Sequence, residues 1–176
     1  MLLQGYQLRA FLLQDSRTPA TTLLQYDVVV CTYEFLYRQH AALVDFELRF
    51  EKFRDRKGPR PKRPILSLYS GIFNDLGHPI IYLVLDEAQK AKSLGAFHSA
   101  IKALPHEATL MLSGTFCDMQ FYDVFGLLDF LKGHPILSPG IFKEIFTSQG
   151  ENGIVLSLSL ISFPCLFSWE VYARVV

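Results

Sequence analysis

Two adjacent carboxylates at the end of an apolar run carry the clearest chemistry in this sequence. Ile80–Leu85 is apolar without a break, and Asp86 and Glu87 follow it directly. Such a run is typical of a strand buried on both faces of a parallel sheet, and open α/β sheets bind ligands at the carboxyl ends of their strands. Asp86 is then placed to hold Mg²⁺ through a nucleotide, and Glu87 to orient a water. The alternative is two solvated acids at an ordinary strand end.

More polar residues follow this strand and the next one. Gln89 can donate and accept hydrogen bonds, which suits it to sensing a nucleotide or a neighbouring lobe. Thr109–Leu112 has the pattern of another strand, and Ser113, Gly114 and Thr115 stand at its exit. Hydroxyls at that place can hydrogen-bond the carboxylates of the adjacent strand and relay the nucleotide state to another surface. A simple Ser-Gly turn is the alternative.

A candidate contact to nucleic-acid phosphate lies earlier in the chain. Val28–Cys31 is a β-branched, apolar segment that predicts a buried strand, and a helical pattern runs from Phe35 to about Phe53. Thr32 stands between them as the expected N-cap. Its hydroxyl and the helix N-terminus suit a phosphate, although a capped helix without a ligand fits equally well.

A basic loop follows that helix. Residues 49–63 contain eight Lys or Arg and two acidic residues, and prolines at 59, 61 and 64 exclude regular structure there. Lys57, Arg60, Lys62 and Arg63 are the candidates for contacts to phosphate. A solvated surface loop is the alternative interpretation.

The remaining helical patterns complete an alternation of strands and helices. Ser93 is the expected N-cap of a helix that contains Phe97 and Leu104, and Phe121–Leu131 is amphipathic. Weaker helical patterns cover Met1–Leu13 and Leu66–Leu76. This order of elements predicts an α/β fold with a mostly parallel sheet flanked by helices.

Composition narrows the class of protein. The chain has 176 residues, half of them hydrophobic, and a formal net charge of zero. Three widely spaced cysteines, Cys31, Cys117 and Cys165, form no metal-ligand or disulfide pattern, which fits a reducing compartment. The N-terminus lacks the features of a signal peptide. The uncharged stretch Ile154–Trp169 is shorter than a bilayer span, so we expect no stable membrane association.

Three ordered motifs resemble those of Swi/Snf-type ATPases in helicase superfamily two. Tyr26–Glu34 resembles motif Ib, Asp86–Gln89 resembles motif II, and Leu112–Thr115 resembles motif III. Lys92 stands where a lysine is common after motif II. The Gly-Thr ending of motif III differs from the Ser-Ala-Thr of DEAD-box RNA helicases. Order and spacing agree over about residues 26–135, and three motifs together are far more specific than one.

The departures from the family pattern predict an incomplete domain. Gln89 replaces the usual histidine, and Phe116 replaces a common proline. The sequence contains no Gly-Lys-Thr phosphate loop, and the second lobe is missing as well. The resemblance therefore implies an incomplete RecA-like lobe over residues 26–147. Residues 1–25 are expected to be a poorly defined N-terminal segment. Residues 148–176 are expected to be an apolar tail of uncertain origin, from a shifted reading frame or a retained intron.

The resemblance also implies a function for the complete family member. ATP and Mg²⁺ are the expected cofactors, with Asp86 and Glu87 catalytic and with Gln89 and Ser113–Thr115 coupling ATP to the other lobe. Double-stranded DNA or a nucleosome is the expected partner, chromatin remodelling the expected process, and the nucleus the expected location.

Without the phosphate loop, we expect little or no ATP hydrolysis by this chain, because its carboxylates have no triphosphate to act on. Activity would need the missing parts of the ATPase. The open sheet edge predicts marginal stability or aggregation. Two alternatives stay open: a non-catalytic module that binds nucleic acid or a partner, and a truncated gene model without independent function.

Overall fold

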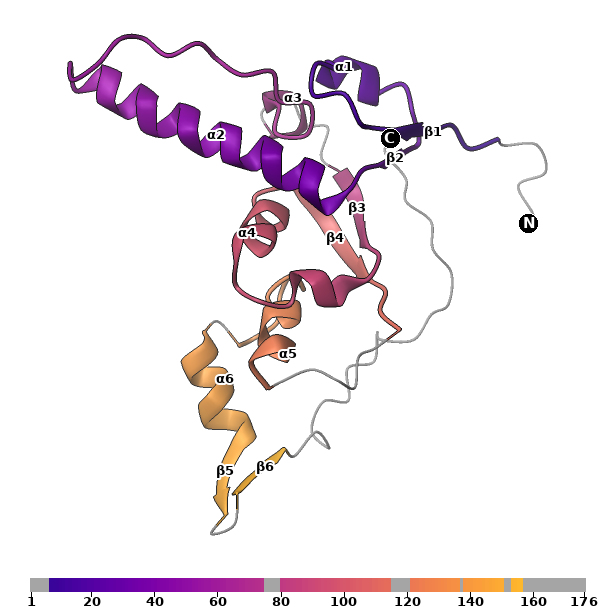
Figure 1. The fold of residues 1–176 in the computed structure, drawn as a ribbon. Helices are drawn as coiled ribbons and strands as arrows, with labels where there is room; N and C mark the ends of the chain where they lie inside the picture. The colour runs from indigo at the N-terminus through magenta and orange to yellow at the C-terminus, as the bar shows by residue number, and fades with distance from the viewer. Residues whose placement is uncertain (1–6, 75–79, 115–120, 137, 151–152, 157–176) are drawn as a thin grey trace.

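The computed structural model describes residues 7–74, 80–114, 121–136, 138–150 and 153–156 (Figure 1). In chain order its elements are β1 (Ala10–Leu12), α1 (Ala20–Leu23), β2 (Val28–Val30), α2 (Tyr33–Arg54), α3 (Gly71–Asn74), β3 (Ile80–Leu85), the 3₁₀ helix η1 (Ala88–Ala91), α4 (Ala96–Lys102), β4 (His106–Met111), α5 (Phe121–Leu128), α6 (Pro139–Phe146), β5 (Thr147–Gly150) and β6 (Gly153–Leu156).

Two pairs of parallel strands form the sheet part of the fold. β1 pairs with β2, and β3 pairs with β4 in a register that sets Leu85 opposite Met111. Each pair is closed by a crossover, through α1 in the first and through η1 and α4 in the second, as parallel strands require. β5 and β6 form a separate antiparallel hairpin. The α/β class with mostly parallel strands and flanking helices is thus confirmed, and the fold is consistent with a partial RecA-like lobe.

The strands β2 and β3 are less buried than the sequence predicted. Val30 is 51% exposed and Tyr82 is 46% exposed, whereas Leu85 at the end of β3 is buried. A cavity of about 480 Å³ lies between the two strands and is lined mostly by apolar side chains, including Leu36 and Leu68. In the described part of the chain no ladder of backbone hydrogen bonds joins β2 to β3. Among the described strands, β2 and β3 therefore each pair along one edge only, which fits their incomplete coverage.

The long helix α2 begins as the sequence predicted. The Thr32 side chain accepts a hydrogen bond from the backbone N–H of Phe35 at 3.1 Å, which confirms it as the N-cap. Phe35, Leu36 and Gln39 are buried in the first two turns. The Gln39 amide also accepts a hydrogen bond from the backbone N–H of Leu68 at 3.2 Å. Tertiary contacts therefore hold the N-terminal half of α2.

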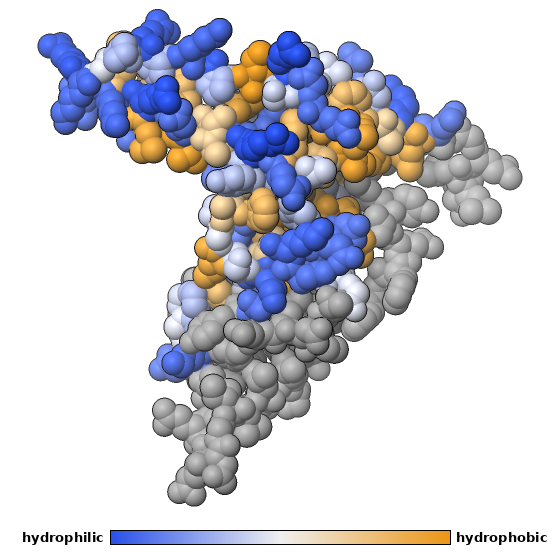
Figure 2. All heavy atoms as spheres, viewed as in Figure 1, coloured by the Kyte–Doolittle hydropathy of each residue, from blue (hydrophilic) through white to orange (hydrophobic). Residues whose placement is uncertain are grey.

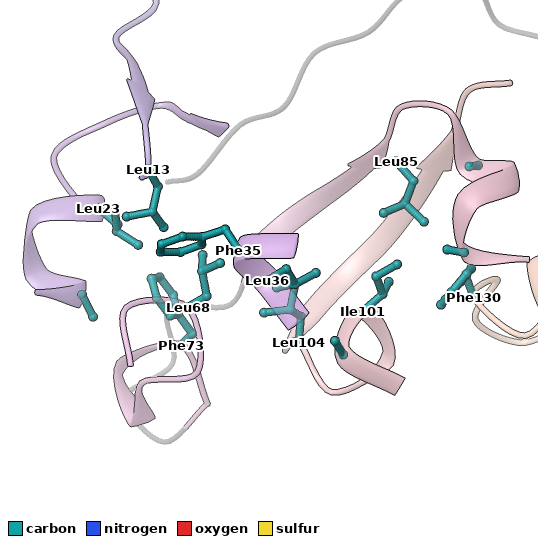
Figure 3. Close-up of a cluster of buried hydrophobic side chains, with 14 of the residues drawn as sticks. Leu13, Leu23, Phe35, Leu36, Leu68, Phe73, Leu85, Ile101, Leu104 and Phe130 are labelled. Carbon is teal, nitrogen blue, oxygen red and sulfur yellow. The ribbon is translucent and has the colours of Figure 1, made fainter. Parts of the chain in front are cut away.

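The main core joins the N-terminal segment to the β3–β4 unit (Figure 3). Leu13 and Leu23 are each 1% exposed and belong to the same cluster as Phe35 of α2. The cluster continues to Leu85 of β3 and Ile101 of α4. Residues from the first 25 positions are therefore part of the packed core. A second, smaller cluster consists of Phe125, Leu128, Ile136 and Phe142.

Three local predictions were wrong. Residues 10–12 form β1 rather than part of a helix, because pairing with β2 is a tertiary effect that local pattern does not encode. α4 begins after Gly95, so Ser93 is not its N-cap. Within Leu66–Leu76, the described helix α3 covers four residues only. Among the described residues, no helix has the length and apolar character of a membrane span.

Candidate functional site

The ends of β3 and β4 bring the predicted motif residues to one edge, which we call the acidic rim: Asp86, Glu87, Gln89 and Ser113. β3 and β4 are paired and parallel, and Asp86 and Ser113 follow them by one and two residues. The Leu112 backbone N–H donates to the Leu85 carbonyl at 2.9 Å, so the ladder extends to the base of the rim. Gly114 is described and exposed, and Thr115 lies outside the described residues.

A tight turn sets the direction of the Glu87 side chain. Glu87 has φ 52° and ψ 50°, the left-handed conformation that costs a residue other than glycine about 1–2 kcal/mol. An Asp86 carboxylate oxygen accepts the Glu87 backbone N–H at 3.0 Å, and the Leu112 carbonyl accepts the Ala88 N–H at 2.9 Å. Both bonds stabilise the turn, which leads into η1. The backbone here is fixed by its neighbours in β4 as well as by its own sequence.

Side-chain hydrogen bonds connect the two motifs across the sheet edge. The Ser113 hydroxyl donates to the Gln89 amide oxygen at 2.7 Å, and the Gln89 amide nitrogen donates to the Glu87 carboxylate. The sequence predicted a bond from hydroxyl to carboxylate. In the structure the Gln89 amide bridges the Ser113 hydroxyl and the Glu87 carboxylate, because it offers both an acceptor and a donor.

Tyr33 completes the site, and sequence reasoning missed it. Its hydroxyl donates to the backbone carbonyl of Asp86 at 2.9 Å, so the start of α2 is tied to the acidic rim. Burial, together with the nearby carboxylates of Asp86 and Glu87, raises the pKa of Tyr33 to about 12. Its position in the motif, next to Thr32 at the end of β2, was the signal that could have indicated it.

The carboxylates fit a metal that arrives with a nucleotide. Asp86 and Glu87 are both exposed, and carboxylate oxygens are the donors that Mg²⁺ prefers. Within the described ranges, no group of three or more His, Cys, Asp or Glu is arranged to hold a metal ion. Two carboxylates at a sheet edge suit Mg²⁺ that keeps phosphate and water ligands rather than a closed protein cage.

The helices α4 and α5 contact η1 and the residues that follow it. The Lys92 ammonium pairs with the Asp123 carboxylate at 2.7 Å, which connects the segment after motif II to α5. A Cβ placed on Gly126 of α5 would overlap the backbone carbonyl of Lys92, so only glycine permits this close approach. The His98 ring lies 3.2 Å from the Gly126 carbonyl oxygen. Lys92, which stands where the family pattern has a lysine, thus contacts α5 through its ammonium group and its backbone carbonyl.

The predicted nucleic-acid residues fall into two separate places. Thr32 is exposed at the N-terminal end of α2, close to the acidic rim through Tyr33. Lys57, Arg60, Lys62 and Arg63 follow its C-terminal end in sequence, and the last three line a groove with Phe46 and Phe50. Phe46 is 14 positions after Thr32, which corresponds to about 21 Å along a helix. Lys57 pairs with Asp55 at 3.8 Å. The structure therefore does not bring these five residues into one site.

Comparison with family models gives a match that covers most of the chain. A family model described as the SNF2-related domain matches residues 4–168. This range is wider than residues 26–135 and includes most of the tail. A search of curated proteins found no match. Because the family model covers most of its length, the chain belongs to the SNF2-related domain family, the Snf2-type ATPases of helicase superfamily two.

Proposed function

We propose that this chain supplies the magnesium-binding carboxylates and the coupling residues of a DNA-dependent Snf2-type ATPase. The observation that supports this most is the connected series Ser113–Gln89–Glu87 across the ends of two paired strands. Asp86 holds Mg²⁺ through the nucleotide, and Glu87 orients the attacking water. Gln89 links Glu87 to Ser113 of motif III, so a change in nucleotide state is relayed to that motif.

The nucleic-acid contact in this proposal is at the start of α2. Thr32 is exposed at a helix N-terminus, where backbone N–H groups and a hydroxyl suit a phosphate. Tyr33 then connects that phosphate contact to Asp86 through its hydroxyl. Double-stranded DNA, as it occurs in a nucleosome, is the proposed partner. Chromatin remodelling in the nucleus is the proposed setting.

By itself the chain is proposed to hydrolyse little or no ATP. Its sequence contains no Gly-Lys-Thr phosphate loop, and such a loop supplies the N–H groups and lysine that hold the triphosphate. The direct test measures ATP turnover of the purified chain with and without double-stranded DNA. Turnover that Glu87→Gln abolishes would contradict this part of the proposal.

A chimera tests the acidic rim where a triphosphate can bind. Residues 80–114 of this chain would replace the matching segment of an active Snf2-family ATPase. We expect DNA-stimulated turnover to be retained and Glu87→Gln to lower kcat by about 100-fold or more, since positioned general-base groups contribute about 10²–10⁴. Gln89→His in the same chimera serves as the matched control, because histidine is the usual residue there. A folded chimera that binds DNA and ATP without turnover would refute the proposal.

A second candidate function is a non-catalytic binding module. The cations of the loop after α2 favour it, because the described residues offer Arg60, Lys62 and Arg63 no ion-pair partner. These cations, with Lys57, are candidates for contacts to nucleic-acid phosphate. Binding of a DNA duplex in the absence of nucleotide, weakened by salt, would support this function.

A further inference from the structure

A groove lies at the end of α2 that is remote from the acidic rim. Phe46 and Phe50 of the helix form one side, and Arg60, Pro61, Lys62 and Arg63 of the following loop form the other. Its volume is about 480 Å³. We call it the α2 groove. It is separate from the cavity between β2 and β3 and from every residue of the acidic rim.

The helix side of the groove continues as an aromatic stripe. Phe46, Phe50 and Phe53 are spaced i, i+4 and i+7, so they lie on one helix face. The rings of Phe46 and Phe50 are 5.8 Å apart at 28°, and those of Phe50 and Phe53 are 6.2 Å apart. Phe50 is 44% exposed and Phe53 is 38% exposed. Aromatic side chains left this open favour burial against a partner.

The loop side of the groove is cationic and restrained. Residues 44–63 contain eight Lys or Arg and four acidic residues. Two of the four acids pair with other cations, Asp45 with Arg49 and Asp55 with Lys57. Among the described residues, Arg60, Lys62 and Arg63 line the groove and form no ion pair. Prolines at 59, 61 and 64 fix φ along the loop and reduce the entropy lost on binding.

Figure 2 colours the surface of this region by hydropathy. Hydrophilic residues surround the far end of α2, at the upper left of the view, and hydrophobic residues lie beneath them. An apolar floor with a cationic rim matches a ligand that presents apolar side chains at its centre and carboxylates around them.

We propose that the α2 groove binds an acidic amphipathic helix of a partner protein. Apolar residues spaced i, i+4 and i+7 on the partner match the spacing of the aromatic stripe, as in helix-in-groove recognition. Carboxylates flanking those residues pair with Arg60, Lys62 and Arg63. A nucleic acid could use the same cations, so an oligonucleotide and a DNA duplex are the competitors in the test below.

The test measures binding of a labelled peptide to the full chain by fluorescence anisotropy. The probe is an acidic peptide of about 16 residues with Leu at i, i+4 and i+7, enough for about four helical turns. The control peptide has the same composition with its Leu residues moved off helical spacing. A single-stranded oligonucleotide and a DNA duplex serve as competitors. We expect the spaced peptide to bind more tightly than the scrambled one by about tenfold, since the buried anchors supply most of the affinity.

Two variants locate the binding site. Phe50→Ala and the double variant R60E/R63E are each expected to weaken binding of the spaced peptide by about tenfold or more. Leu48→Ala is the matched control, because Leu48 is 54% exposed on the same helix and does not line the groove. Far-ultraviolet circular dichroism checks that each variant keeps its helix, and R60E/R63E alters only exposed loop residues.

Three results would overturn the proposal. The first is equal affinity for the spaced and scrambled peptides. The second is unchanged binding by both Phe50→Ala and R60E/R63E. The third is displacement of the peptide by an oligonucleotide at lower concentration than by unlabelled peptide, which would assign the groove to nucleic acid.

Discussion

The acidic rim and the C-terminal half of α2, about residues 44–54, are both exposed and charged, yet different kinds of contact hold them. We call the second region the far half of α2. At the rim, hydrogen bonds join residues far apart in sequence, such as Ser113 to Gln89 and Tyr33 to Asp86. In the far half of α2, the side-chain contact is local, between Asp45 and Arg49 at i and i+4. Chemistry that needs several groups at fixed distances is found where tertiary contacts converge. A surface that recognises a partner needs only an open, ordered face.

Gly126→Ala should give the largest change in stability. The added Cβ would push α5 away from Lys92, which directly follows η1, the helix that contains the acidic-rim residue Gln89. The new Cβ would overlap the backbone carbonyl of Lys92, which cannot rotate away. We expect a loss of about 3 kcal/mol in the free energy of unfolding, measured by urea denaturation. The matched control is Gly58→Ala in the basic loop, where a Cβ meets open space, and we expect a change within about 0.5 kcal/mol. Equal midpoints for the two variants would refute the contrast between the regions.

Acid should weaken the β3–β4 unit next. Burial lowers the pKa of His98 and of His106, although Asp129 beside His98 and the Leu104 carbonyl beside His106 act in the opposite direction. Because each folded-state pKa lies below the unfolded value of about 6.5, the unfolded chain takes up protons first. The stability from these neutral rings is present above that value and is lost as pH falls through the folded pKa.

Urea midpoints measured from about pH 8 down to about pH 5 test this expectation. His106→Gln should flatten the pH dependence whatever it does to the stability at neutral pH, because it removes one of the two groups that titrate. A pH dependence unchanged in that variant would contradict the assignment.

The link across the acidic rim should have a measurable coupling energy. Ser113→Ala and Gln89→Ala each remove the 2.7 Å bond between these side chains. In a double-mutant cycle we expect a coupling of about 1 kcal/mol, the usual net contribution of a hydrogen bond in a protein. Ser93→Ala is the matched control, since Ser93 is exposed and is not the N-cap of α4. Additive effects of the two rim substitutions would mean that the bond does not couple the motifs.

This difference between the regions also explains which features the sequence could predict. The strand before Asp86 and the cap at Thr32 depend on short-range pattern, and both were predicted correctly. The shared edge of Asp86 and Ser113 followed from two parallel strands of similar length. The fold class could therefore be inferred from patterns within single elements.

Contacts that depend on tertiary packing could not be predicted in this way. Nothing local shows that Gln89 separates Ser113 from Glu87, because that depends on side-chain length across two strands. β1 was missed since three residues become a strand only when β2 pairs with them. Thr32 and Arg63 lie in separate places because more than half of α2 stands between them.

The smallest effect should come from the ion pair on the far half of α2. Asp45→Ala removes the 3.0 Å contact to Arg49, but both side chains are more than half exposed. Solvent screens such pairs, so we expect a loss of about 0.3–0.5 kcal/mol that shrinks further as salt is added. The urea midpoint at low and high salt measures it, and Arg17→Ala, which breaks the exposed pair with Asp15, is the matched control. A loss of about 1 kcal/mol, as large as that expected for the bond between Ser113 and Gln89, would refute the contrast between the two regions.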